Sequence, residues 1–222
     1  MDWQALWLSI RLGVLSILVL LPLAVFIGRM LAFRAIRGKP LIEAAVALPL
    51  VLPPTVLGFY LLVAFGSGSW IGEIWERLFG GPLVFTFQGL LLASVIVNLP
   101  FAIQPAQRAF EAIGADVREA AATCGMSWWR TLWRIELPLA WPGLLTGMVL
   151  TFAHTLGEFG VVLMVGGSIP GETKTVAIAI YDRVQVFDDA AAGQMAAVLL
   201  LISIATIAAS YALSQRVVRR DV

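Results

Sequence analysis

The chain has 222 residues, of which 60% are hydrophobic and 13% charged, with a net charge of +1 and a mean hydropathy of +0.91. A soluble domain cannot bury so large an apolar fraction, so the composition excludes one and predicts an integral membrane protein surrounded by lipid. One histidine and one cysteine exclude an internal disulfide and a metal centre rich in nitrogen or sulfur ligands, and we expect no nucleic-acid partner.

Five stretches free of Asp, Glu, Lys and Arg are long enough, or nearly so, to cross a bilayer. They cover residues 12–28, 44–72, 78–107, 137–157 and 190–215. A spanning helix needs about 20 residues. The first stretch is shorter, but the arginines at its ends can extend towards the headgroups and lengthen it. Because open strands cannot exist in lipid, the sequence predicts an all-α protein with five transmembrane helices.

The basic residues lie mostly on one side of these helices. Eleven of the fifteen fall in segments 29–43 and 108–136 and in the tail with Arg216, Arg219 and Arg220. Since positive loops remain inside, the N-terminus is predicted outside and the C-terminus inside. The first helix is expected to stay uncleaved, because its basic cluster follows the apolar run. Segment 175–189 is too charged to span and is predicted to be a short helix at the outer surface.

Two predicted spans contain helix-breaking residues. Pro53 and Pro54 interrupt the second, and Asn98 with Pro100 is expected to do the same to the third, because proline removes a backbone donor. A kink for packing and a break that lines a pathway both remain open. Asn98 either faces a wet cavity, together with Thr86, Gln88 and Gln104, or hydrogen-bonds between helices. In the fourth span, a G-x-x-x-G pair at Gly143 and Gly147 predicts close helix packing.

A polar segment, residues 109–137, separates the third and fourth spans and is predicted to be cytoplasmic. Asp116 followed by Glu119 resembles a capping box that would start a short helix at Val117. Gly125 supplies the left-handed position that ends this helix. Its small side chains, including Ala120 to Ala122 and Cys124, would let another protein approach the backbone closely.

A second short helix is predicted after Gly125. Ser127 can cap it, and Pro138 suits the first turn of the next membrane helix. The tryptophans Trp128, Trp129, Trp133 and Trp141 suit the inner membrane interface. Composition alone leaves open whether the segment docks a protein or merely lies on lipid.

The spacing of Glu119, Ala120, Ala121, Gly125, Ile135, Leu137 and Pro138 resembles the EAA loop of ABC-importer permeases. The resemblance extends from about residue 5 to residue 215. LPLVLPPTVLGFYLLV at 48–63, TLGEFG at 155–160 and IPGETKT at 169–175 are similar to segments of the molybdate, tungstate and sulfate group, and the last favours molybdate.

The resemblance implies that residues 1–222 form one transmembrane domain with the type I ABC importer permease fold. It implies a pore in the bacterial inner membrane that imports molybdate, built from two copies of this chain. Its partners would be two cytoplasmic ATPase subunits, coupled through the seven EAA residues, and an extracytoplasmic oxyanion-binding protein. A tungstate or sulfate/thiosulfate permease is the alternative, and a channel or ion-coupled secondary transporter is the alternative outside the ABC class.

The sequence contains no G-x-x-x-x-G-K-[ST] phosphate loop. We therefore expect no enzymatic activity and no cofactor on this chain, with ATP and Mg held by the partner ATPase.

Two further sites are predicted on the outer side. Glu158 is an acidic residue in a hydrophobic region, one turn after His154. A bare carboxylate would repel a dianion, so we expect a hydrogen bond or a cation to hold Glu158, and we expect it to structure the outer gate. A proton-coupled role for the pair stays open. Pro170, Gly171 and Glu172 form a turn-rich loop that either contacts the binding protein or simply connects two helices.

Overall fold

A computed structural model describes residues 1–218, and every regular element in that range is a helix. The helices before the polar segment are α1 (Trp3–Phe33), α2 (Lys39–Val51), α3 (Pro54–Phe65), α4 (Trp70–Phe79) and α5 (Phe87–Glu111). Those from the polar segment onward are α6 (Ala115–Thr123), α7 (Trp128–Thr131), the π-helical turn η1 (Leu132–Glu136), α8 (Leu137–Gly157), α9 (Gly160–Gly166), α10 (Val176–Gln185) and α11 (Asp189–Val218). Arg219 and Arg220, which contributed to the predicted orientation, lie outside the described residues.

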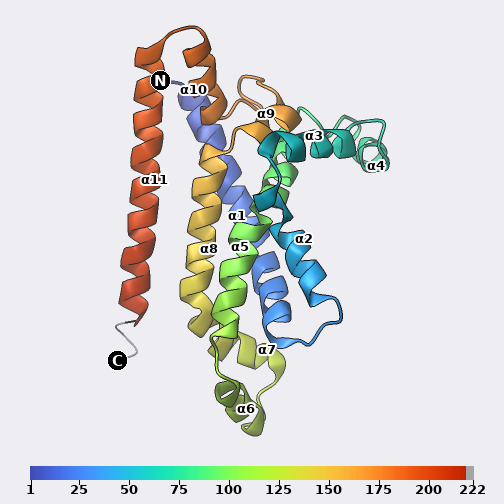
Figure 1. Cartoon of the computed structure of the whole chain (residues 1–222), viewed down its shortest axis with the longest axis vertical. Coiled ribbons are helices and arrows are strands. Elements are labelled where there is room, and N and C mark those ends of the chain that lie inside the picture. The colour runs from blue at the N-terminus through green and yellow to red at the C-terminus, as the bar shows by residue number, and fades with distance from the viewer. Residues whose placement is uncertain (219–222) are drawn as a thin grey trace.

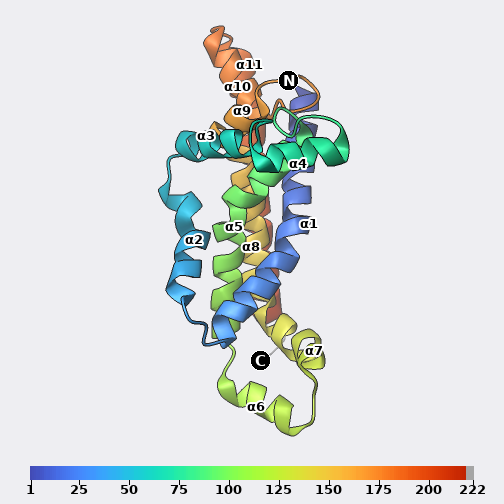
Figure 2. The ribbon, with the colours of Figure 1, turned by 90° about the vertical axis from the view of Figure 1, so that its right-hand side faces the viewer.

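Four helical stretches are long and apolar enough to cross a membrane: α1, α5, the run from α7 to α8, and α11. α1 and α8 pack along α5, and α11 lies along the other side of α8 (Figure 1). α6 lies at one end of this bundle, called here the α6 end, and the N-terminus and α10 lie at the opposite end (Figures 1 and 2). The short helix predicted within 175–189 is α10, as expected.

The second predicted span is broken. α2 and α3 meet at Pro53 with a bend of 111°, and Pro54 begins α3 where its missing N–H is not needed. The 13 residues of α2 extend only about 20 Å, less than the roughly 30 Å of a hydrocarbon core. The predicted interruption is therefore confirmed, and the five spans comprise four continuous helices and one broken pair.

The third predicted span is not broken. α5 continues through Pro100 and Pro105, so of the two alternatives at Asn98 and Pro100 the break is wrong. The loss of a backbone hydrogen bond is tolerated here because α1 and α8 pack against α5 from two sides.

The G-x-x-x-G pair does bring two helices close together. A methyl group on Gly143 would lie 2.8 Å from the carbonyl oxygen of Pro105, and one on Gly147 would lie 3.1 Å from that of Ala102. Larger residues at these positions would force α8 away from α5, so the close-packing prediction is confirmed.

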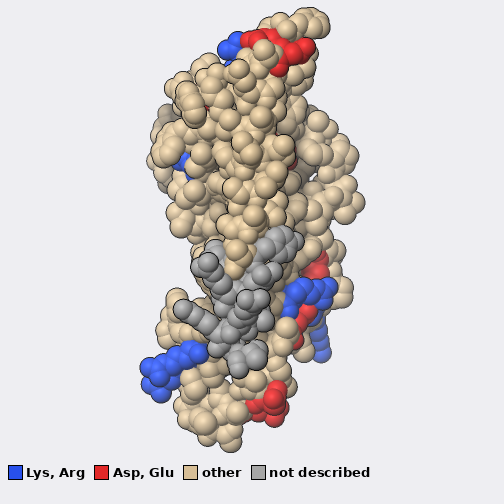
Figure 3. Space-filling view, turned by 90° about the vertical axis from the view of Figure 1, so that its left-hand side faces the viewer, with Lys and Arg blue, Asp and Glu red and all other residues tan. Residues whose placement is uncertain are grey.

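Charged residues gather towards the two ends of the molecule. On the face shown in Figure 3, a band almost free of Lys, Arg, Asp and Glu separates charged groups at the α10 end from those at the α6 end. Such a band is what a protein embedded in a bilayer presents to the hydrocarbon.

Candidate functional site: the α6 segment and the polar network of α5 and α8

The start of α6 differs from the prediction. Gly114 is the N-cap and the helix begins at Ala115, earlier than the expected Val117. Asp116 is thus already inside the first turn, and no side chain caps the helix, so the predicted capping box with Glu119 is wrong. The Asp116 carboxylate still lies near the positive end of the helix dipole, where a negative charge is favourable.

The end of α6 agrees with the prediction. Gly125 has a φ of +70° and follows the C-cap Cys124. The N–H of Gly125 donates to the carbonyl of Ala122, and that of Met126 donates to the carbonyl of Ala121. These two bonds form a Schellman motif, which needs a left-handed residue at the position of Gly125.

The seven predicted coupling residues divide into exposed and buried groups. Glu119, Ala120 and Gly125 are exposed, as is Pro138, whereas Ile135 and Leu137 are partly buried. Ala121 is only 3% exposed and faces the chain itself. Glu119, Ala120, Ala122 and Gly125 therefore lie on the exposed surface of α6 and its C-terminal turn.

The second short helix is not separate from the membrane helix. Ser127 caps α7 as predicted, because its Oγ accepts from the N–H of Arg130. The helix then continues through η1 into α8, where the N–H of Leu137 bonds to the carbonyl of Leu132. This wider π turn immediately precedes Pro138, whose ring would clash with a regular preceding turn. Pro138 lies in the first turn of α8 as expected, but α8 is a continuation and not a new start.

A buried carboxylate at the base of α8 was not identified from the sequence. Glu136 is 1% exposed, and both of its oxygens accept from Arg29 of α1, through Nε and Nη2. Nε of Arg118 on α6 lies 3.8 Å from Oε1 of the same carboxylate, and the Arg118 guanidinium stacks over Phe33 at 3.8 Å. Glu136 thus joins η1 to α6 and to α1, and α1 lies about a hundred residues earlier in the sequence.

Only one signal for this site was available in the sequence. Glu136 occupies the unspecified position between Ile135 and Leu137 of the EAA pattern, at the start of an apolar run. A carboxylate at the edge of a membrane span needs a cation, but pairing alone does not say which of many arginines supplies it.

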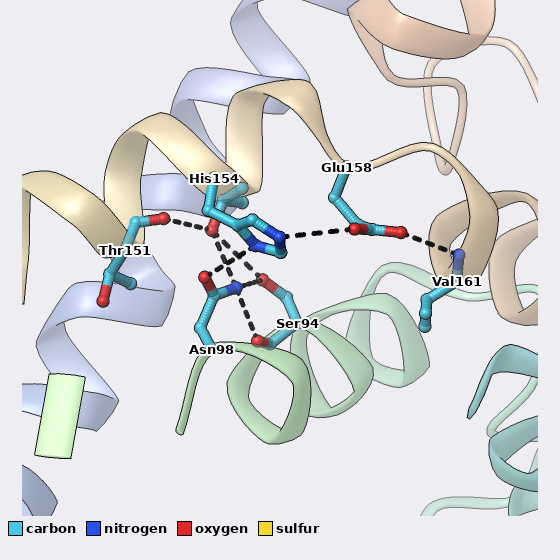
Figure 4. Close-up of polar contacts among 7 residues, drawn as sticks. Ser94, Asn98, Thr151, His154, Glu158 and Val161 are labelled. Atoms are coloured by element: carbon cyan, nitrogen blue, oxygen red, sulfur yellow. Dashed lines mark hydrogen bonds and ion pairs between the residues drawn. The ribbon is translucent and has the colours of Figure 1, made fainter. Parts of the chain in front are cut away.

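A second cluster of polar side chains lies inside the bundle and includes Asn98, which is fully buried (Figure 4). Its Nδ2 donates to the Ser94 carbonyl at 2.8 Å and to Thr155 Oγ1 at 3.1 Å. Ser94 in turn hydrogen-bonds to Ser16 of α1 at 2.8 Å. Asn98 therefore links α5 to α8, which supports hydrogen bonding between helices over the wet-cavity alternative.

His154 and Glu158 extend this network to the end of α8. Because Asn98 uses its amide nitrogen on Ser94 and Thr155, its Oδ1 accepts from Nδ1–H of His154 at 3.1 Å. Nε2 of His154 then lies 3.7 Å from Oε2 of Glu158. A neutral imidazole bonded in this way turns an unprotonated nitrogen towards the carboxylate, so the contact becomes attractive only when the pair carries one more proton.

The other oxygen of Glu158 holds the start of the next helix. Oε1 accepts from the N–H of Val161 at 2.9 Å, in the first turn of α9 (Figure 4). The expectation that a hydrogen bond holds this carboxylate is confirmed. Gly160 lies between the two, and a methyl group there would be 2.8 Å from Cβ of Pro54. The structure thus brings Pro54 against Gly160, two residues after Glu158, although the sequence separates them by about a hundred residues.

The predicted outer loop lies at the end opposite α6. Pro170, Gly171 and Glu172 are all exposed, and Gly171 has a φ of +81°, which accounts for the turn. Lys174 next to this loop forms an ion pair of 2.6 Å with Asp182 of α10. The loop is thus fixed to α10 at its base, and Gly171 at its tip lies against the side chain of Gln4 in α1.

Residues 12–220 match the protein family described as "Binding-protein-dependent transport system inner membrane component". The chain belongs to this family. One relative, the molybdenum transport system permease protein ModB of Azotobacter vinelandii, is 48% identical over 95% of this chain and 93% of its own length. Another, the sulfate transport system permease protein CysW of Synechococcus elongatus, is 33% identical over 98% of this chain and 76% of its own length.

A solved structure shares the fold. A chain of a bacterial alginate ABC transporter, crystallised with an alginate pentasaccharide-bound periplasmic protein, superposes with a TM-score of 0.77 at 17% identity and covers 96% of this chain and 78% of its own. The fold is that of an ABC importer permease, as predicted. Together with family membership, the apolar helices identify a multi-pass protein of the inner membrane.

Proposed function

We propose that this chain is the membrane-spanning subunit of an importer that moves molybdate across the inner membrane. The observation that carries the proposal is the 48% identity, along nearly the whole chain, to a relative named as a molybdenum transport permease. A sulfate permease is the second candidate, supported by a more distant relative.

In this proposal the α6 end faces the cytoplasm, where a separate pair of ATPase subunits binds ATP and Mg. The basic side chains of this end support the orientation: Arg34, Arg37, Lys39, Arg108, Arg118, Arg130 and Arg134. The loop at Pro170, Gly171 and Glu172 then faces outward, where an oxyanion-binding protein delivers the substrate. The absence of a phosphate loop from the sequence supports a separate ATPase.

A second copy of the chain would complete the pore. Along the broken span, Val51 is 78%, Phe59 51% and Tyr60 61% exposed. In the apolar stretch of α11 within Asp189–Ala209, only 11% of the residues are buried. Apolar faces this large are typical of surfaces that another helix or lipid covers. The broken span supports a place beside the substrate pathway, because irregular backbone at membrane depth is tolerated where protein or water surrounds it.

The ion pairs at Glu136 give a route for coupling. When the ATPase pair closes, a shift of α6 would be transmitted by Arg118 to Glu136 at the base of α8, and through Arg29 to α1. At the other end of α8, Glu158 braces α9 beside Pro54, where we place the outer gate. Rigid-body movement between two packed arrangements is the usual form of such transitions.

Uptake competition tests the substrate. In cells that lack their own molybdate and sulfate importers and express this chain with the ATPase and binding protein of its operon, labelled molybdate should accumulate. Excess unlabelled molybdate should abolish the uptake, and excess sulfate should leave most of it. Sulfate uptake that molybdate does not inhibit would support the sulfate permease, and uptake without the ATPase would support a secondary transporter or channel.

Replacing Gly125 by valine should detach the ATPase while the chain stays in the membrane. A β-branched residue at a φ of +70° costs about 1–2 kcal/mol, and no neighbouring atom would clash, so the effect is confined to the end of α6. Copurification of the ATPase with the affinity-tagged chain is the measurement.

Gly80→Val is a matched control for Gly125→Val. Gly80 also follows a helix, has a φ of +78° and has open space around it, but it ends α4. It should therefore retain the ATPase. If both variants lose the ATPase equally, the cause is general misfolding. If both variants retain the ATPase, docking at α6 is contradicted.

A further inference from the structure

A large groove opens between the second half of α1 and the start of α8. It has a volume of about 880 Å³. Leu21, Val25 and Leu144 line its deep end, and Arg34, Trp128 and Trp133 lie at its mouth. Apart from Arg29 and Arg34, its lining side chains are aliphatic or aromatic. Two coupling residues, Leu137 and Pro138, line part of one wall, but coupling to an ATPase does not explain the size or the apolar lining of the groove.

The length of the groove corresponds to one leaflet of a bilayer. From Leu21 to Arg34, α1 rises about 20 Å, and half of a hydrocarbon core is about 15 Å, with the headgroup beyond it. The mouth lies at the α6 end, where the tryptophans are at the level expected for the membrane interface. An acyl chain in the deep end would therefore place its headgroup beside Arg34.

The mouth of the groove carries uncompensated positive charge. Arg29 and Arg118 share the single carboxylate of Glu136, which leaves a net charge of one. Arg34 is exposed, and within the described part of the chain no carboxylate lies within ion-pair distance of it. Guanidinium groups form strong paired hydrogen bonds with phosphate, so this mouth attracts an anion that remains attached to an apolar tail.

We propose that the groove is a binding site for one anionic phospholipid of the leaflet at the α6 end. Its acyl chains lie between α1 and α8, and its headgroup contacts Arg34 beneath the tryptophans. The exposed guanidinium of Arg34 at one end of an apolar groove matches an anionic headgroup attached to acyl chains, so charge favours the lipid over an apolar face of a second copy. Because the groove wall includes Arg29 and Leu137, the lipid would support the contact of α1 with the base of α8. The proposal rests on the proposed function only for which leaflet is cytoplasmic, and its test requires no transport.

Quenching of tryptophan fluorescence by brominated lipids tests this site. The purified full-length chain is titrated in detergent with phosphatidylglycerol brominated in its acyl chains, and separately with equally brominated phosphatidylcholine. The tryptophans at the mouth should be quenched at lower concentrations of phosphatidylglycerol. Arg34→Gln should weaken phosphatidylglycerol binding about fivefold, which is the effect of one basic residue at a membrane surface, and should leave phosphatidylcholine unchanged.

Two further variants make the test specific. Arg37→Gln removes an exposed arginine of the same loop that does not line the groove, and it should bind phosphatidylglycerol as the wild type does. Val25→Phe fills the deep end and should weaken both lipids. The proposal is overturned if Arg34→Gln and Arg37→Gln behave alike, or if Val25→Phe converts a dimer to a monomer while lipid quenching is unaffected, because a second copy would then occupy the groove.

Discussion

Replacing Glu136 by glutamine should both destabilise the chain and disconnect ATP hydrolysis from uptake. The carboxylate is 1% exposed and binds two arginines. Glutamine has a similar shape but removes the charge and leaves the arginines to repel each other. Breaking a buried ion pair in this way costs about 3 kcal/mol. Thermal unfolding in detergent, together with uptake and ATPase rates of the reconstituted complex, measures both effects.

The geometry predicts how strongly each of three variants at this site lowers the stability of the chain. Arg29→Gln removes two hydrogen bonds and should be the next most damaging after Glu136→Gln. Arg118→Gln removes a single, longer contact from a residue whose side chain is 37% exposed, so it should change stability least. Because Arg118 is the partner on α6, however, it should still lower uptake per ATP hydrolysed. If it lowers stability and coupling in the same proportion as Arg29→Gln, the separate coupling role of Arg118 is wrong.

A surface glutamate provides the control for the charge change. Glu73 is 54% exposed on its side chain and pairs with Arg77 of the same helix, and surface pairs contribute little. Glu73→Gln should therefore leave both the unfolding temperature and the coupling ratio close to those of the wild type.

Replacing Asn98 by leucine should lower stability by about 1–2 kcal/mol. Asn98 hydrogen-bonds to Ser94 within α5 and to Thr155 and His154 of α8. The two bonds between helices contribute about 0.6 kcal/mol each, and the buried groups left without a partner add to the loss. Leucine has a comparable size, so lost hydrogen bonds and not a cavity account for the effect. The His154 ring would also lose its fixed orientation towards Glu158, so uptake should fall more than ATPase assembly.

Gln104→Leu is the matched control for Asn98→Leu. Gln104 lies on the same helix but is exposed, and the same substitution there should leave unfolding unchanged. If both variants lose stability to a similar extent, the cause is the added hydrophobicity of α5. If Asn98→Leu loses no stability, the hydrogen-bond network is not needed for packing.

Local chemistry in the sequence was sufficient to predict the end of α6 and the cap of α7. Gly125 and Ser127 act on backbone groups within a few residues, so their roles follow from spacing alone. The start of α6 was misplaced by two residues. The spacing of Asp116 and Glu119 fits a capping box with Asp116 as the N-cap, whereas in the structure Gly114 is the N-cap and Asp116 lies in the first turn. The π turn before Pro138 was missed because it depends on how the whole helix continues, which no residue within it specifies.

The polar clusters depend on tertiary structure and were predicted only in part. Asn98 was identified alone, and His154 and Glu158 were identified as a pair one turn apart, because polar residues inside membrane spans are rare. Their connection through Asn98 required the packing of α5 against α8. Glu136 was missed for the same reason: its two arginines lie on other elements, one of them over a hundred residues earlier in the chain.

The unbroken helix from Trp128 to Gly157 has a mechanical consequence. Its 30 residues form a stiff rod of about 45 Å. Glu136 lies about a quarter of the way along it and Glu158 immediately after it, so about 33 Å of helix separate the two residues. A tilt of about 5° would displace Glu158 relative to Glu136 by about 3 Å, which is about the length of a hydrogen bond. The two carboxylates would therefore move as parts of one rigid body, and no chain of side-chain rearrangements through the bilayer is required between them.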